Sequence, residues 1–152
     1  MYPAVLLLHS WLRWLVLLAA LFAIAQAIAG MRGGRAWNAS ADRSLKLFTI
    51  SLDVQFLLGV ILYGISPFTQ AAMQDMASAM RIAGVRFFAI EHLVGMVIAV
   101  IFAHVGRAQI RKATSDGAKY QRALAFTGIA LAIILASIPW PGMATGRPLF
   151  RF

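Results

Sequence analysis

The sequence predicts an all-α integral membrane protein, a bundle of four transmembrane helices. Of the 152 residues, 61% are hydrophobic and only 12% are charged, which is more apolar surface than a soluble domain of this size can bury. The apolar residues also gather into four long runs, as a bilayer core about 30 Å thick requires of each helix that crosses it. We expect a single domain over residues 1–152, with helices at about 4–31, 45–66, 84–111 and 120–138.

Prolines stand at the ends of several of these runs. The runs are Leu6–Met31, Leu45–Ile65, Val85–Val105 and Ala123–Ile138. Pro3 precedes the first run, where proline is tolerated in an opening helical turn, while Pro67 and Pro139 follow the second and fourth. Because no basic segment precedes the first run, it lacks the pattern of a signal peptide, and we expect a mature helix there.

Basic residues beside the runs predict how the chain is oriented. The net charge is +9, but these residues cluster in loops, which is the positive-inside pattern rather than a nucleic-acid-binding stripe. The two basic loops hold Arg32, Arg35, Arg43, Lys46, Arg107, Arg111, Lys112, Lys119 and Arg122. We expect both loops in the cytoplasm against anionic lipid, and both termini on the outer side. The outer side's own arginines oppose this assignment; they are Arg81, Arg86, Arg147 and Arg151.

The outer loop between the second and third runs is expected to form a short amphipathic helix over Phe68–Ala83. Met73, Met76 and Met80 would share one stripe of that helix. Soft sulfur ligands can bind copper(I), but apolar anchoring to the membrane or to a partner explains the stripe more simply. Because the chain has no cysteine, disulfides, thiolate metal sites and covalent haem attachment through cysteine are excluded.

Ionisable side chains inside the apolar runs are the candidate functional residues, because a charged group in a bilayer is costly. They are His9, Arg13, Asp53, Glu91, His92 and His104. A b-type haem needs two imidazoles from different helices at similar depth, and His9 and His92 meet this demand when depth is counted from the outer ends. Counted from the inner ends the depths differ, since His9 lies 23 residues from Arg32 and His92 lies 15 from Arg107.

The other ionisable residues receive subordinate roles. Arg13 follows His9 by one helical turn and could bind a haem propionate; Arg86 is a second propionate candidate, with snorkelling to the interface as the alternative. Glu91 points about 100° away from His92, and we expect it to pair with an arginine or to take up protons near a quinone. His104 finds no matching histidine on the first helix, so we expect one haem and a hydrogen-bonding role for His104.

Four short segments resemble a family of small bacterial membrane proteins usually described as cytochrome b-like. They are His9-Ser10-Trp11-Leu12-Arg13-Trp14, Arg86-Phe87-Phe88-Ala89-Ile90-Glu91-His92, Ala103-His104-Val105-Gly106-Arg107 and Ile138-Pro139-Trp140-Pro141. The similarity spans nearly the whole chain. It implies a four-helix, haem-binding, multi-pass protein of the bacterial inner membrane.

We therefore expect a membrane b-type cytochrome that transfers single electrons through one haem b held by His9 and His92. It would not be an enzyme alone, since an iron with two histidine ligands has no open position for substrate. It could belong to a larger respiratory or photosynthetic complex and exchange electrons with a quinone or a periplasmic carrier. Alternatives are a cofactor-free accessory subunit, a chlorophyll-binding protein with one axial histidine, and a proton or ion carrier that uses Asp53, Glu91 and His104.

Overall fold

The computed structural model describes residues 1–151 and is all-α, with no strand in that part of the chain. Four segments are long and apolar enough to cross a membrane: Tyr2–Arg32, Ala39–Ile65, Ala83–Arg111 and Asp116–Ser137. The all-α class is therefore confirmed, and each predicted span overlaps one of these four segments. The first, second and fourth segments are the single helices α1, α2 and α7.

Side-chain caps explain why two helices begin earlier than the hydrophobic pattern predicts. Helix α2 begins at Ala39, because the Asn38 side chain accepts a hydrogen bond from the Ala41 N–H at 3.0 Å. Helix α7 begins at Asp116, because the Ser115 hydroxyl accepts from the Ala118 N–H at 3.2 Å. Both caps lie in polar sequence ahead of the apolar runs, so each helix gains a turn outside its hydrophobic stretch.

The third span is not one regular helix. It consists of α5 (Ala83–Arg86), a wider π-helical turn η1 (Phe87–Glu91) and α6 (His92–Arg111). The Tyr63 hydroxyl on α2 donates to the Ala89 carbonyl at 3.1 Å, which holds this wide turn against its neighbour. Such turns are rare and recur at functional sites, and this one ends at His92.

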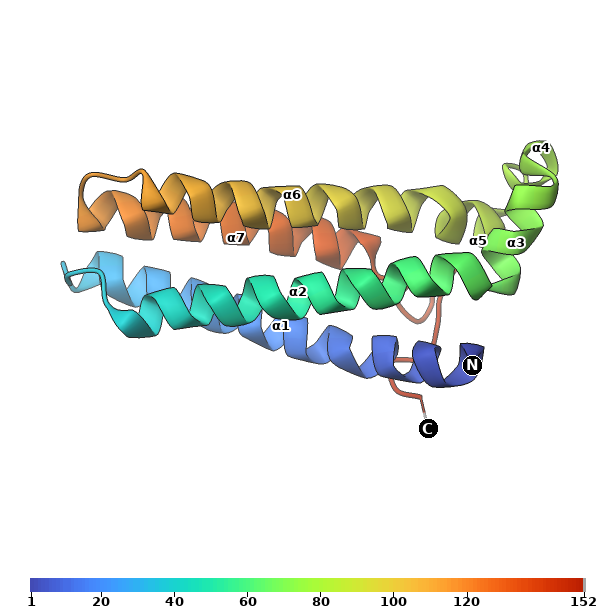
Figure 1. Cartoon of the computed structure of the whole chain (residues 1–152), viewed down its shortest axis with the longest axis horizontal. Coiled ribbons are helices and arrows are strands. Elements are labelled where there is room, and N and C mark those ends of the chain that lie inside the picture. The colour runs from blue at the N-terminus through green and yellow to red at the C-terminus, as the bar shows by residue number, and fades with distance from the viewer. Residues whose placement is uncertain (152) are drawn as a thin grey trace.

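The four long helices lie side by side along the length of the molecule (Figure 1). Each contacts two neighbours, in the cyclic order α1, α2, α6, α7, and the α2–α6 seam is the least extensive. Fully buried alanines, Ala20, Ala99 and Ala130, lie in the core beside Phe48 and Leu52. Small residues at helix contacts let backbones approach closely, which is how helices associate in lipid.

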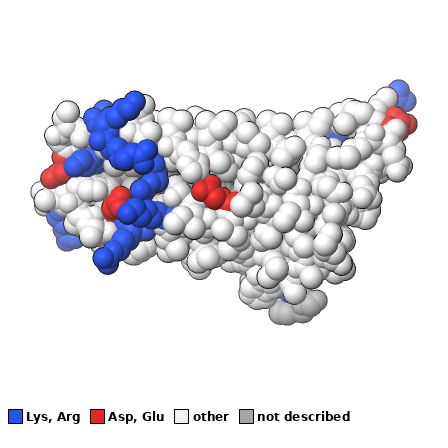
Figure 2. Space-filling model, in the orientation of Figure 1, with Lys and Arg blue, Asp and Glu red and all other residues white. Residues whose placement is uncertain are grey.

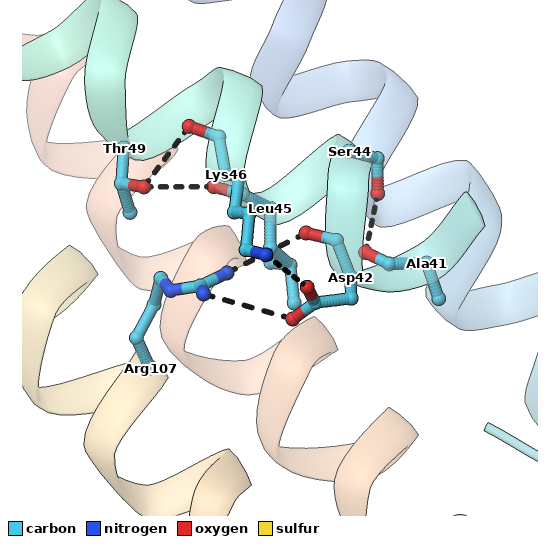
Figure 3. Close-up of polar contacts among 7 residues, drawn as sticks. All are labelled: Ala41, Asp42, Ser44, Leu45, Lys46, Thr49 and Arg107. Atoms are coloured by element: carbon cyan, nitrogen blue, oxygen red, sulfur yellow. Dashed lines mark hydrogen bonds and ion pairs between the residues drawn. The ribbon is translucent and has the colours of Figure 1, made fainter. Parts of the chain in front are cut away.

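Basic side chains gather at one end of the molecule and leave a long, almost uncharged middle (Figure 2). That end carries the α1–α2 and α6–α7 connections, whereas the N terminus and the C-terminal segment lie toward the other (Figure 1). There Asp42 on α2 pairs with Lys46 at 2.9 Å and with Arg107 on α6 at 3.6 Å, and Arg107 also donates to the Asp42 carbonyl at 3.5 Å (Figure 3). These contacts close the open α2–α6 seam at its basic end.

The prediction of a single helix over Phe68–Ala83 is wrong. The segment forms α3 (Pro67–Gln74) and α4 (Met76–Ala79), because the Asp75 carboxylate caps the Ser78 N–H at 3.0 Å and starts a new helix. Met73 and Met76 are exposed, whereas Met80 packs against the buried Ala72–Ala79–Ala89 cluster. The three sulfurs therefore do not form one exposed stripe, and the copper(I) alternative loses its basis.

Candidate functional site

A cavity opens among α1, α2, α6 and the C-terminal segment, at the end of the bundle away from the basic loops, and both His9 and His92 line it. Their ring centroids are 6.3 Å apart, with ring planes inclined at 72°. Two imidazole nitrogens each about 2 Å from a shared metal ion would place the centroids roughly 6 Å apart. The two histidines that the outer-end count puts at similar depth therefore lie close together.

The hydrogen bond of His92 defines which of its nitrogens is available. Its Nδ1 donates to the Ser137 carbonyl of α7 at 2.7 Å, since a carbonyl can only accept. Nε2 then carries the lone pair, which is the arrangement usual for a metal-binding histidine with an outer hydrogen-bond partner. Phe87 and Phe88 flank the ring, with centroids at 5.9 and 6.3 Å, and limit its rotation.

Buried polar atoms without a partner concentrate at this cavity. Within residues 1–151 they are His9 Nδ1, Arg13 Nε and Gln55 Oε1, and all three residues line the cavity. Most buried polar atoms in proteins are satisfied, so an unsatisfied group calls for a water, an ion or a ligand. Three at one place indicate a site that is completed by something the chain itself does not supply.

The charged side chains that line the cavity are all basic. They are Arg13, Arg147 and Arg151, and none of the five Asp and Glu side chains lines it. Arg147 lies over the rings of Phe68 and Phe88, at 4.8 and 4.9 Å from their centroids, which orients its guanidinium. Three arginines on an apolar cavity that no Asp or Glu side chain lines favour an anionic ligand.

The C-terminal segment brings two of these arginines to the site. The Leu149 carbonyl accepts hydrogen bonds from Arg13 at 2.5 Å and from Trp14 at 3.3 Å, and the Arg151 carbonyl accepts from Trp11 at 2.9 Å. Phe150 stacks on Trp14 at 5.3 Å. Trp11 and Trp14 thus hold the segment across the start of α1.

Glycines give one further indication of close approach. A Cβ added at Gly59 of α2 would lie 3.3 Å from His9 Cε1, so the missing side chain makes room for this imidazole. Gly95 instead makes room for Ser137, and Gly128 has nothing within 4 Å. Only Gly59 relates directly to the histidine pair.

Arg86 and Glu91 lie outside the cavity. Arg86 donates to Glu91 at 2.6 Å, half exposed, and does not line the cavity, so the ion pair expected for Glu91 is present.

Arg147 and Arg151 were not predicted as site residues and were counted only as basic residues that oppose the orientation. Arginines in a short segment after the last apolar run were the available signal, but nothing in the sequence shows that this segment folds back.

His104 lies away from the cavity and pairs with Asp53 of α2, Nε2 to Oδ1 at 2.8 Å. This agrees with the hydrogen-bonding role expected for His104. Glu91, bound to Arg86, is not part of this pair, so the polar track through Asp53, Glu91 and His104 has no geometric support.

A haem can be tested against these residues. No set of three or more histidine and carboxylate side chains comes together within residues 1–151, so two histidines suit a metal whose remaining ligands come from a cofactor, as a porphyrin provides. The cavity measures about 150 Å³, the volume that holds a benzene ring. A porphyrin would therefore have to extend through the open side of the cavity, because Arg147 and Arg151 line it from the C-terminal segment. The ligands and charges fit, and the volume requires that adjustment.

No protein-family model, curated protein or solved structure matches this chain.

Proposed function

We propose that the protein is a membrane b-type cytochrome that binds one haem b between His9 and His92 and transfers single electrons. The observation that carries this proposal is the histidine pair at 6.3 Å on a cavity that also holds three arginines and three unsatisfied buried polar atoms. When bound, the haem supplies reversible one-electron chemistry at its iron. Haem combines an iron that the two histidines would bind with carboxylates that the arginines would bind.

The chain's own residues would bind and orient the cofactor. His9 and His92 would hold the iron, and the Ser137 carbonyl fixes the His92 tautomer. Arg13, Arg147 and Arg151 would bind the carboxylates, with Arg147 held in place over the rings of Phe68 and Phe88. Apolar walls from Leu52, Val60, Leu93, Met96 and Ile134 keep water away from the centre.

The membrane orientation belongs to the same proposal. The basic end faces the cytoplasm of a bacterial inner membrane, as the positive-inside rule favours, and the histidine pair then lies toward the outer side with both termini. Electron exchange with a quinone or with a carrier outside the membrane follows from that placement.

A cofactor-free accessory subunit is the second candidate, and the volume of about 150 Å³ favours it. In that case the histidines and arginines would join α1, α6 and the C-terminal segment only for stability. The two candidates differ in one property, which is haem content at full occupancy.

The test is a reduced-minus-oxidised absorption spectrum of detergent-purified protein from haem-replete cells, with a pyridine haemochrome assay for stoichiometry. We expect a b-type spectrum at about one haem per chain. His9→Ala and His92→Ala should each abolish it, because the single imidazole that remains in each variant would leave one ligand position of the iron empty.

His104→Ala is the matched control, since this histidine lies outside the cavity and its loss should leave the spectrum unchanged. Circular dichroism would show that all variants keep their helices. A colourless, folded wild-type protein would leave the accessory-subunit function in its place.

A further inference from the structure

The Asp53–His104 pair lies on the outside of the bundle at membrane depth. The His104 side chain is 53% exposed and that of Asp53 is 40% exposed. Asp53 lies next to the midpoint of its span Ala39–Ile65, and His104 lies about 10 Å along the helix from the midpoint of Ala83–Arg111. The hydrocarbon core extends about 15 Å to either side of its centre, so both groups would face lipid tails.

The hydrocarbon of lipid tails is an unfavourable environment for an ionisable pair. Ionisable groups inside membranes almost always face a bundle interior, a cavity or a partner, because exposure to hydrocarbon is costly. Figure 2 shows acidic atoms on the middle stretch of this face, apart from the basic end, and the cavity described above does not include either residue. Something outside the bundle therefore has to cover the pair.

The surrounding surface also lacks a neighbour. In the third span, which contains α6, 17% of the most apolar stretch is buried, against 39% in each of the other three spans. Large apolar side chains flank the pair on both helices, including Leu57 on α2 and Ile101 on α6, at 61% and 52% exposure. We define the α2–α6 face as Asp53, Leu57, Ile101 and His104.

We propose that the α2–α6 face binds the same face of a second copy of this chain, forming a two-fold symmetric dimer in the membrane. Two copies inserted in the same direction are related by an axis along the membrane normal, which keeps every residue at its own depth. That operation places α2 of one copy opposite α6 of the other. Asp53 of each copy then meets His104 of the other, acid against base.

This charge self-complementarity is what selects a second copy as the occupant. The two contacts form together by symmetry, and all four polar groups leave the lipid. Polar contacts between helices stabilise association in membranes, whereas apolar side chains alone gain little, because lipid tails are equally apolar. The proposal concerns residues that do not line the histidine cavity, and it does not depend on haem.

Disulfide cross-linking in native membranes tests the dimer, and the absence of cysteine from the chain makes each introduced thiol unique. A tagged Leu57→Cys chain is co-expressed with an untagged Ile101→Cys chain, positions one turn from Asp53 and His104 in the same direction along the bundle. The control pair is Leu18→Cys with Ile129→Cys, which are exposed on α1 and α7. We expect mixed dimers from the first pair only.

Two further variants connect the dimer to the polar pair. Asp53→Leu with His104→Leu should lower the cross-linked fraction roughly tenfold, because two symmetric polar contacts are lost. The exchange variant, Asp53→His with His104→Asp, should restore it, since acid still meets base. Equal cross-linking in both thiol pairs, no mixed dimer, cross-links to a different protein, or a double-leucine variant that dimerises as well as wild type would each overturn the proposal. Far-UV circular dichroism confirms that each variant is folded.

Discussion

At the scale of single residues, the proposed site depends on how closely the backbone of α2 approaches His9. Gly59 permits that approach, because a Cβ there would lie 3.3 Å from the imidazole. Gly59→Leu should displace the ring from its partner and weaken haem binding about tenfold, a typical effect of overpacking. The measurement is the haem content of purified protein after dilution.

Gly64→Leu is the matched control for this change, because Gly64 lies on the same helix with nothing within 4 Å. Equal haem content in the two variants would show that His9 does not ligate at the observed position.

The arginines give a second prediction for single residues. It distinguishes Arg86, the propionate ligand expected from the sequence, from Arg147, which the structure places at the cavity. Arg147 lines the cavity, whereas Arg86 is paired with Glu91 and half exposed. Arg147→Gln should raise the haem dissociation constant about 10- to 100-fold, the value of one charge-assisted hydrogen bond. Arg86→Gln should leave it within about fivefold, because exposed ion pairs contribute little. Haem transfer to apomyoglobin measures both dissociation constants. A larger increase in Arg86→Gln than in Arg147→Gln would favour Arg86 as the propionate ligand.

At the scale of helices, α6 and α7 depend on close contact. A Cβ added at Gly106 of α6 would lie 2.5 Å from Phe126 Cβ on α7, an atom too close to its backbone to swing aside. Gly106→Ala should destabilise the fold by about 1–3 kcal/mol, seen as a lower thermal midpoint in detergent. Gly128→Ala on α7, where the space is open, should be neutral or slightly stabilising because alanine favours helix. Equal midpoints would argue against the observed α6–α7 packing.

The helices also show how far the sequence could lead. The four spans follow from apolar runs that length alone makes recognisable, and the histidine pair follows from depth along two helices. The caps at Asn38 and Ser115 extend helices into polar sequence, where hydrophobic periodicity carries no signal. The π-helical turn before His92 has no clear signature in its residues, Phe87–Glu91, and its hydrogen bond from Tyr63 comes from another helix.

The arginine set could not be predicted for a different reason. Arg147 and Arg151 reach the cavity only because the C-terminal segment returns to α1, where Leu149 and Arg151 accept hydrogen bonds from Trp11, Arg13 and Trp14. Those are contacts to backbone carbonyls across about 140 residues of sequence. No residue type in the segment encodes them.

At the scale of the whole molecule, the basic end and the uncharged middle predict one orientation. Gln74 lies in the connection with α3 and α4, and Lys112 follows α6 at the basic end. A membrane-impermeant thiol reagent applied to intact cells should label Gln74→Cys and leave Lys112→Cys unlabelled until the cells are opened. The opposite pattern would place the histidine pair toward the cytoplasm and change the side from which electrons are exchanged.

Electron paramagnetic resonance of the oxidised protein tests whether His9 and His92 bind the same iron. The ring planes are inclined at 72°, and nearly perpendicular axial imidazoles leave two iron d orbitals close in energy. We predict a strongly anisotropic low-spin ferric signal, retained in His104→Ala and absent from His9→Ala and His92→Ala. A high-spin signal in the wild-type protein, or a low-spin signal that survives either ligand substitution, would contradict ligation by this pair.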